Sequence, residues 1–210
     1  MSKTKETSFV SDALRLMLIT VIAGLLLGLV YTVTYEPIQA AQNATTIAAY
    51  KQVFPDAADF QEDENGAALI EANAASLAEQ GFGNVLIDKV VNAIDANGEV
   101  VGHIINASSK EGYGGLVSIS VGIQADGQTV NGIAFLSISE SAGLGMNARD
   151  TDWYKQFSGK KGEKFEVTKA GDGELDNEKI NAISGATITS RAVTNAVNAA
   201  LYFVNNGLKQ

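Results

Sequence analysis

The stretch VLIDKVVNAIDANGEVVGHII, residues 85–105, decides the fold of this chain. Apolar and β-branched residues dominate 85–91 and 99–105, and Asp95-Ala96-Asn97-Gly98 lies between these two runs. Two such runs on either side of an Asn-Gly turn are typical of a β-hairpin. The sequence therefore predicts two antiparallel strands here, with His103 interpreted as an ordinary strand residue.

A second hairpin is predicted directly after the first. Apolar residues alternate through 116–123, Ala125-Asp126-Gly127 can turn the chain, and an apolar run returns over 129–138. Alternation with a period of two predicts a half-buried strand. The centre of the chain is therefore expected to be an antiparallel sheet of at least four strands.

Helices are predicted before and after this sheet along the chain. Residues 36–54 are expected to form a helix that begins at Pro37, and a short helix capped by Asp150 or Thr151 should hold Trp153. A last helix is expected from Thr189-Ser190 to a cap at Asn206-Gly207. Its apolar residues follow an i, i+3, i+4, i+7 stripe: Val193, Ala196, Val197, Ala200, Leu201 and Val204. The predicted fold class is α+β, an antiparallel sheet packed by helices.

The segment LMLITVIAGLLLGLVYTV, residues 16–33, carries no charge over 18 residues. A helix of this length spans about 27 Å, close to the hydrocarbon core of a bilayer. The apolar run is longer than the hydrophobic region of a usual signal sequence, which favours a retained anchor over a cleaved signal. We therefore predict a single transmembrane helix over residues 16–35.

Three bases, Lys3, Lys5 and Arg15, precede the span and favour a cytoplasmic N-terminus. The predicted order is a cytoplasmic segment 1–15, the transmembrane helix 16–35, a helical connector 36–84 and an extracytoplasmic domain 85–210. The expected location is the cell (inner) membrane, with the main domain outside the cytoplasm.

Composition excludes several kinds of chemistry. The chain has 210 residues, a net charge of −9, no cysteine and one histidine. Acidity of this size argues against a nucleic-acid partner, and the absence of cysteine excludes thiolate, iron–sulfur and Cys-zinc sites. The acidic run over 56–64 lacks EF-hand spacing, so no metal site is predicted. No catalytic residue is predicted either.

Two glycine-containing segments could allow a ligand to approach the backbone. The first is Gly112-Tyr113-Gly114-Gly115, and the second, Glu140-Ser141-Ala142-Gly143-Leu144-Gly145, follows a predicted strand. Glycine permits positive φ and close backbone approach. A tight turn and a strand-to-helix connection are the alternative interpretations.

The third segment, Ser184-Gly185-Ala186-Thr187-Ile188-Thr189-Ser190, immediately precedes the last predicted helix. Free N–H groups and the helix dipole favour an anion at such a position, so a phosphate site is physically reasonable. The alternative is a plain Ser/Thr helix cap.

Taken in order, these segments resemble the FMN-binding domains of the G subunit of the Rnf complex and the C subunit of the sodium-pumping NADH:quinone oxidoreductase. The resemblance covers residues 10–207, and the chain length suits the Rnf protein better. It implies that FMN is joined by a phosphoester to Thr187, through a flavin transferase that uses FAD and a divalent metal. It also implies ligand-binding roles for two groups of residues. Ser184, Gly185, Ala186, Ile188 and Thr189 would surround the phosphate, and Tyr113, Gly114, Gly115, Glu140, Gly143, Leu144 and Gly145 would line the flavin.

The family pattern usually has Asp three residues before the serine, where this chain has Asn181. Slower flavinylation is the expected consequence. The resemblance further implies an electron-carrying subunit, without independent activity, in a membrane-bound ion-translocating ferredoxin:NAD⁺ oxidoreductase. Its partners would be the other membrane subunits of the complex. The alternatives are the quinone-reductase C subunit, a membrane-anchored binding or scaffolding module without flavin, and a free-standing flavin reductase.

Overall fold

The computed structural model describes residues 3–173, 176 and 178–208, with only the backbone for residues 3–8. The chain divides into two units, Met1–Thr45 and Thr46–Gln210.

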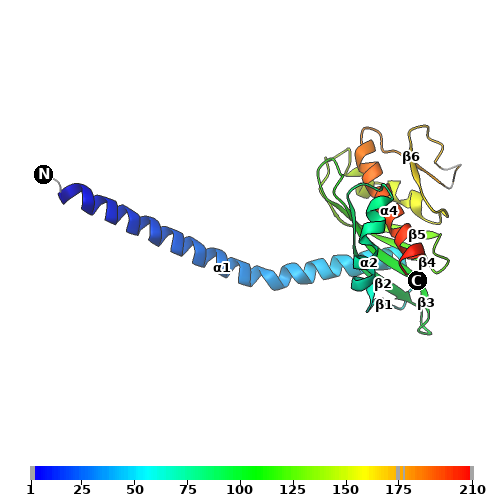
Figure 1. The fold of residues 1–210 in the computed structure, drawn as a ribbon, viewed down its shortest axis with the longest axis horizontal. Helices are drawn as coiled ribbons and strands as arrows, with labels where there is room; N and C mark the ends of the chain where they lie inside the picture. The colour runs from blue at the N-terminus through cyan, green and yellow to red at the C-terminus, as the bar shows by residue number, and fades with distance from the viewer. Residues whose placement is uncertain (1–2, 174–175, 177, 209–210) are drawn as a thin grey trace. The chain divides into compact units, whose positions relative to one another are not determined.

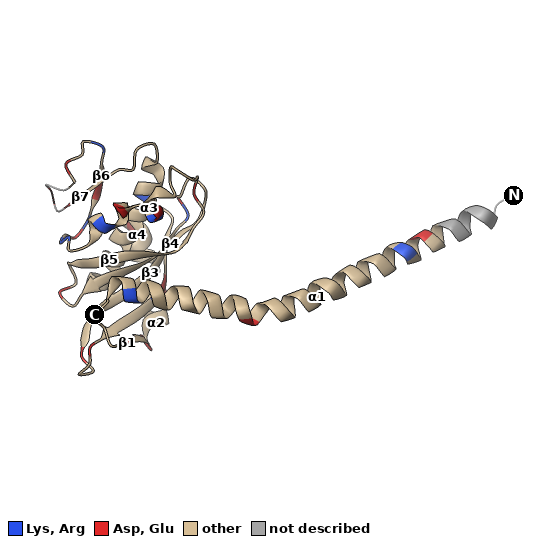
Figure 2. Cartoon of the chain, turned by 180° about the vertical axis from the view of Figure 1, so that it is seen from behind, with Lys and Arg blue, Asp and Glu red and all other residues tan. Residues whose placement is uncertain are grey.

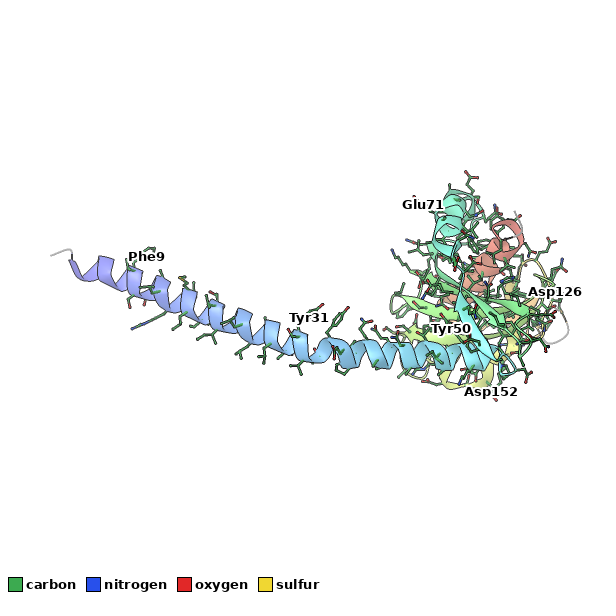
Figure 3. All side chains as sticks on the ribbon, turned by 90° about the horizontal axis from the view of Figure 1, so that it is seen from below. Phe9, Tyr31, Tyr50, Glu71, Asp126 and Asp152 are labelled. Atoms are coloured by element: carbon green, nitrogen blue, oxygen red, sulfur yellow. The ribbon has the colours of Figure 1, made fainter. Side chains whose placement is uncertain are left out.

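The first unit consists of most of helix α1, Lys3–Val53. One stretch of this helix is long and apolar enough to cross a membrane, and its apolar window is fully exposed. Figure 2 shows no charged residue on α1 between Arg15 and Glu36. A core helix of a soluble protein would bury such a surface, so its exposure fits the predicted membrane span. Figure 3 shows the Tyr31 side chain projecting outward from this helix.

Pro37 lies inside α1, so the prediction that it begins a separate helix is wrong. Proline removes one intrahelical hydrogen bond and is usually unfavourable there. A helix of 51 residues keeps its other backbone bonds on both sides of this position.

The second unit is built on five antiparallel strands in the order β1-β2-β3-β4-β5 (Figure 1). They are β1 Asp59–Glu62, β2 Val85–Ile94, β3 Val100–Ser109, β4 Val117–Gln124 and β5 Val130–Ile138. Val90 pairs with Ile105 and Val121 with Ile133, which confirms both predicted hairpins. The second hairpin turns at Gly127, whose φ is +74°.

The predicted helical connector, residues 36–84, is helical only in part. It contains the end of α1, strand β1 and helix α2, Gly66–Glu79. β1 pairs with β2, with Asp59 opposite Ile94, and belongs to the sheet. This strand is short and mostly exposed, so it carries no apolar alternation that could predict it.

The two faces of the sheet are covered differently. Helices α2 and α4, Thr187–Asn206, cover one face over a large apolar core. Residues from the end of α1 cover part of the other face, where Tyr50, Val53 and Phe54 form a smaller cluster. On that side the Tyr50 hydroxyl accepts a hydrogen bond from Asn106 Nδ2 at 2.9 Å.

Shorter elements connect β5 to α4. They are α3 Asn147–Asp150, the 3₁₀ helix η1 Asp152–Phe157, β6 Glu166–Thr168 and β7 Lys179–Asn181. The Thr151 hydroxyl accepts the Trp153 N–H, which confirms Thr151 as the cap. β6 and β7 pair in parallel, with Val167 opposite Ile180. α4 begins at Thr187, two residues before its predicted start, and ends at the predicted cap, Gly207.

Candidate functional site

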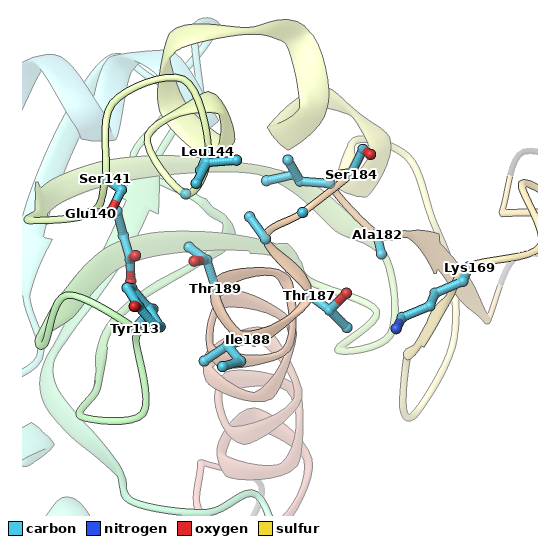
Figure 4. A pocket seen from close by; sticks show the side chains of 14 residues that line it. Tyr113, Glu140, Ser141, Leu144, Lys169, Ala182, Ser184, Thr187, Ile188 and Thr189 are labelled. Atoms are coloured by element: carbon cyan, nitrogen blue, oxygen red, sulfur yellow. The ribbon is translucent and has the colours of Figure 1, made fainter.

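The three segments singled out in the sequence meet around one cavity of about 730 Å³ (Figure 4). Ten of the predicted residues line it: Tyr113, Glu140, Leu144, Gly145, Ser184, Gly185, Ala186, Thr187, Ile188 and Thr189. Gly114, Gly115 and Gly143 are not among its lining residues and lie in the turns that carry those that are. Ser141, Lys169, Ala182 and Ile183 also line the cavity and were not predicted.

A tight turn presents Thr187 to this cavity. The Ala186 N–H donates to the Ile183 carbonyl at 3.0 Å, and Gly185 adopts a φ of +75° in the turn. A side chain at position 185 would be strained by this φ, and its Cβ would lie 3.1 Å from Leu144 Cδ2. The backbone conformation therefore favours glycine here, and a Cβ would also require a small shift of the Leu144 side chain.

The hydroxyl of Ser190 holds this turn against α4. It accepts the Ile183 N–H and donates to the Ala186 carbonyl, both at 3.0 Å. Among the described residues, no side chain caps α4 at its N-cap residue, Ala186. The plain Ser/Thr cap is therefore not what forms, and the first N–H groups of the helix remain available to an anion.

The Glu140 carboxylate occupies a space between two glycines. A Cβ at Gly112 would lie 2.6 Å from Glu140 Oε1, and a Cβ at Gly145 would lie 2.6 Å from both Oε2 and Thr189 Oγ1. Within the described residues, Oε1 is buried without a hydrogen-bond partner. A buried acceptor without a partner is costly, so a donor from a bound ligand would stabilise it.

Exposed apolar side chains surround the cavity. Tyr113 is 73% exposed, Ile188 52% and Leu144 46%. Figure 4 places Tyr113 beside Glu140, Leu144 above the first turn of α4, and Ile188 on that turn. Three apolar side chains around one opening can be covered by a flat aromatic ring.

Lys169 and Asn181 differ in their relation to the cavity. Lys169 lines it, on the side where Figure 4 shows Thr187 and Ala182. Asn181 is not among the lining residues, and its Oδ1 accepts the Gly173 N–H at 2.9 Å. Lys169 belongs to none of the three segments singled out in the sequence, so no local pattern pointed to it.

The comparisons with known proteins agree with this geometry. A family model described as "FMN-binding domain" matches residues 112–202, a range that contains every residue lining the cavity. The G subunit of the Na⁺-translocating ferredoxin:NAD⁺ oxidoreductase complex of Acetobacterium woodii is 33% identical, over 91% of this chain and 89% of that protein. The chain belongs to this G-subunit family.

A further member is the G subunit of the ion-translocating oxidoreductase complex of Methanosarcina acetivorans, which is 30% identical over 98% of each chain. Among solved structures, NqrC of Shewanella oneidensis aligns with a TM-score of 0.47 and 20% identity, over 58% of this chain and 61% of that one. The relatives' names favour the G-subunit family over the C-subunit alternative.

Proposed function

We propose that this member of the G-subunit family carries FMN on Thr187 and passes electrons within a membrane-bound ion-translocating ferredoxin:NAD⁺ oxidoreductase complex. The observation that carries the proposal is the convergence of the three sequence segments on one cavity, with Thr187 on the first turn of α4. Family membership supports the setting, because the relatives are named as subunits of such complexes.

The residues around the cavity fit FMN at each part of the molecule. The free N–H groups of the first turn of α4 suit a phosphate. The exposed apolar side chains of Tyr113, Leu144 and Ile188 suit an aromatic ring, and the buried Oε1 of Glu140 suits an N–H or O–H donor. When bound, FMN supplies the capacity to accept and release electrons, while the chain supplies orientation and shielding.

The attachment is a phosphoryl transfer without a change of oxidation state. The Oγ1 of Thr187 would bond to the phosphorus of the FMN half of FAD, the phosphoanhydride bond to the AMP half would break, and AMP would be the leaving group. The hydroxyl proton would be released in the same exchange. A separate flavin transferase with a divalent metal would catalyse this step, so the chain itself needs to supply only an accessible hydroxyl. Thr187 is half-buried and lines the open cavity, which meets that need.

The membrane helix and its flanking charges predict on which side of the membrane this site would lie. The bases before the span favour a cytoplasmic N-terminus, so the flavin domain would lie outside the cytoplasm. A covalent link would then prevent loss of the cofactor to the outside. The span would hold the domain beside the integral subunits of the complex.

Intact-mass spectrometry of the denatured protein tests the attachment. The full chain is co-expressed with a flavin transferase and purified in detergent. We expect the wild type to gain the mass of FMN minus water on the peptide that contains Thr187. Thr187→Val should lose the modification completely, whereas Ser137→Ala, which removes an exposed hydroxyl outside the cavity lining, should keep it.

Two results would overturn the proposal. Modified Thr187→Val protein would show that the attachment site is elsewhere. An unmodified wild type, with a transferase that is active on a control acceptor, would favour the membrane-anchored module without flavin.

A further inference from the structure

The cavity around Thr187 has an acidic end and a basic end. Its lining contains two charged side chains among the described residues, Glu140 and Lys169. Figure 4 shows Glu140 beside Tyr113 on one side, and Lys169 on the opposite side, next to Thr187 and Ala182. FMN has matching ends, since its ring system offers an N–H donor and its phosphate is an anion.

We propose that Lys169 binds the phosphate of the flavin at Thr187, and that Asn181 positions Lys169 for this task. The proposal rests on the proposed function and adds the orientation of the ligand. The phosphate lies between Lys169 and the first turn of α4, and the ring extends toward Glu140 and Tyr113. An ammonium group and free helix N–H groups would act on the same anion, which is the usual composition of a phosphate site.

The backbone of Lys169 is fixed from the preceding side by the two short parallel strands. Lys169 directly follows β6, whose last residue, Thr168, pairs with Asn181 on β7. The Thr168 carbonyl accepts the Ala182 N–H at 2.7 Å. The backbone just before Lys169 is therefore hydrogen-bonded to residues 181–182, which lead into the turn that carries Thr187. Figure 4 shows the side chains of Ala182, Lys169 and Thr187 on the same side of the cavity.

The turn that follows Lys169 is closed by hydrogen bonds. The Thr168 hydroxyl accepts the Ala170 N–H at 3.0 Å and donates to Asp172 Oδ1 at 2.8 Å. Asn181 Oδ1 accepts the Gly173 N–H at 2.9 Å. These bonds hold the turn on the same strand pair, so Asn181 acts on the cavity through the position of Lys169.

Lys160 holds the other side of Gly173. Its Nζ donates to the Gly173 carbonyl at 2.6 Å and to the Asp176 carbonyl at 2.8 Å, and the side chain is buried. Both backbone groups of Gly173 are thus bonded. A Cβ at Gly173 would lie 2.7 Å from the Asn181 N atom, so a larger residue would push the turn away from β7.

This geometry also gives a physical account of the departure from the family pattern. The atom that Asn181 uses is its side-chain oxygen, which an aspartate also has. Asn181→Asp should therefore keep the turn closed and leave the flavinylation rate within about twofold of the wild type. The slower flavinylation expected from the family pattern does not follow from this geometry. Asn181→Leu has a similar volume but no acceptor, so it should open the turn.

The test measures the initial rate of FMN incorporation into the full-length protein in detergent, with purified transferase, FAD and Mg²⁺, by intact mass. Lys169→Gln should incorporate FMN roughly fivefold more slowly at low salt and approach the wild-type rate at high salt, because salt screens a charge interaction. Lys169→Arg should retain most of the rate. Lys161→Gln is the matched control, since it loses the same charge at a lysine outside the cavity lining and should match the wild type at every salt concentration.

A second readout separates phosphate binding from docking of the transferase. The ³¹P NMR resonance of the attached phosphodiester should shift in Lys169→Gln and stay unchanged in Lys161→Gln. Asn181→Leu should show the same slow incorporation and the same ³¹P shift while Lys169 is still present.

Each outcome decides a separate statement. Equal rates, equal salt dependence and equal ³¹P shifts for Lys169→Gln and the wild type would overturn the role of Lys169 and leave the proposed function intact. A normal Asn181→Leu beside a slow Lys169→Gln would overturn only the positioning role. A wild type that takes up no FMN would overturn the proposed function, and this inference with it.

Discussion

The first two residues of α4 and the body of the same helix have opposite environments. In the first turn, Ile188 is 52% exposed and Thr187 faces the cavity. One turn later the helix enters the core, where Val193, Val197 and Leu201 are fully buried against the sheet. The body supplies apolar area that stabilises the domain, and the first turn supplies free backbone donors and a hydroxyl.

This difference shows how one helix can separate stability from chemistry. The buried body fixes the helix axis, so the first turn can leave its polar groups unpaired without loosening the fold. Substitutions in the two parts should therefore have different consequences. Substitutions in the body should change the free energy of unfolding, and those in the first turn should change cofactor attachment.

The largest expected effect comes from a pair of alanine substitutions, one in each part. Phe203 is 1% exposed in the body, and Phe203→Ala should reduce the free energy of unfolding by about 3–5 kcal/mol because it leaves a cavity. Ile188→Ala, in the first turn, should cost less than about 1 kcal/mol because the side chain is half exposed. Thermal unfolding of the detergent-solubilised chain, followed by circular dichroism, measures both. Equal losses would show that the first turn also bears the stability of the domain.

A smaller effect is expected for two buried hydroxyls on α4. Ser190 joins the two parts, and Ser190→Ala removes the acceptor of the Ile183 N–H, so it should cost about 1–3 kcal/mol and slow FMN incorporation. Thr194 is the matched control, because its buried Oγ1 has no hydrogen-bond partner among the described residues. Thr194→Val should be neutral or stabilise by up to about 1 kcal/mol, with unchanged incorporation. Comparable losses in the two variants would contradict the role given to Ser190.

The smallest effect is expected for Asp126, which lies in the β4–β5 turn. This turn contacts the last turn of α4, where Asn205 Nδ2 donates to the Gly127 carbonyl at 2.7 Å. Two opposing effects act on the pKa of Asp126, and the first of them, partial burial of the carboxyl group, raises it. Hydrogen bonds from the Thr129 hydroxyl and from the Gln128 and Thr129 N–H groups outweigh this effect and lower the pKa to about 2. A carboxyl group with a lowered pKa stabilises the fold above the unfolded pKa, and this contribution is lost as the pH falls toward 2.

The Asp126 side chain is 38% exposed, so solvent screening keeps its contribution below about 1 kcal/mol. Melting temperatures of the wild type and Asp126→Asn measure it. The wild type should melt slightly higher at pH 5, and the difference should shrink between pH 4 and pH 2. A difference that stays constant over this range would show that the charge of Asp126 contributes nothing.

Local patterns were enough to predict the two central hairpins and α4. Each depends on a short-range signal, an Asn-Gly or Asp-Gly turn in the hairpins and an apolar stripe in the helix. β1 could not be predicted in this way, because it is short, mostly exposed and held by pairing with β2. The parallel pair β6–β7 is equally non-local, since its two strands of three residues are separated in sequence by residues 169–178.

The features of the candidate site also fall into two groups, those that local sequence patterns predict and those that depend on packing. The sequence by itself determined which segments carry the chemistry, because Ser184–Thr187 and Glu140–Gly145 have distinctive residues at fixed spacing. Only the tertiary structure decided that these segments share one cavity, that Ser190 closes the Thr187 turn, and that Lys169 stands opposite Glu140. The physical reason is that turns and helices are encoded by neighbouring residues, whereas the meeting of a lysine and a threonine 18 positions apart depends on how separate elements pack.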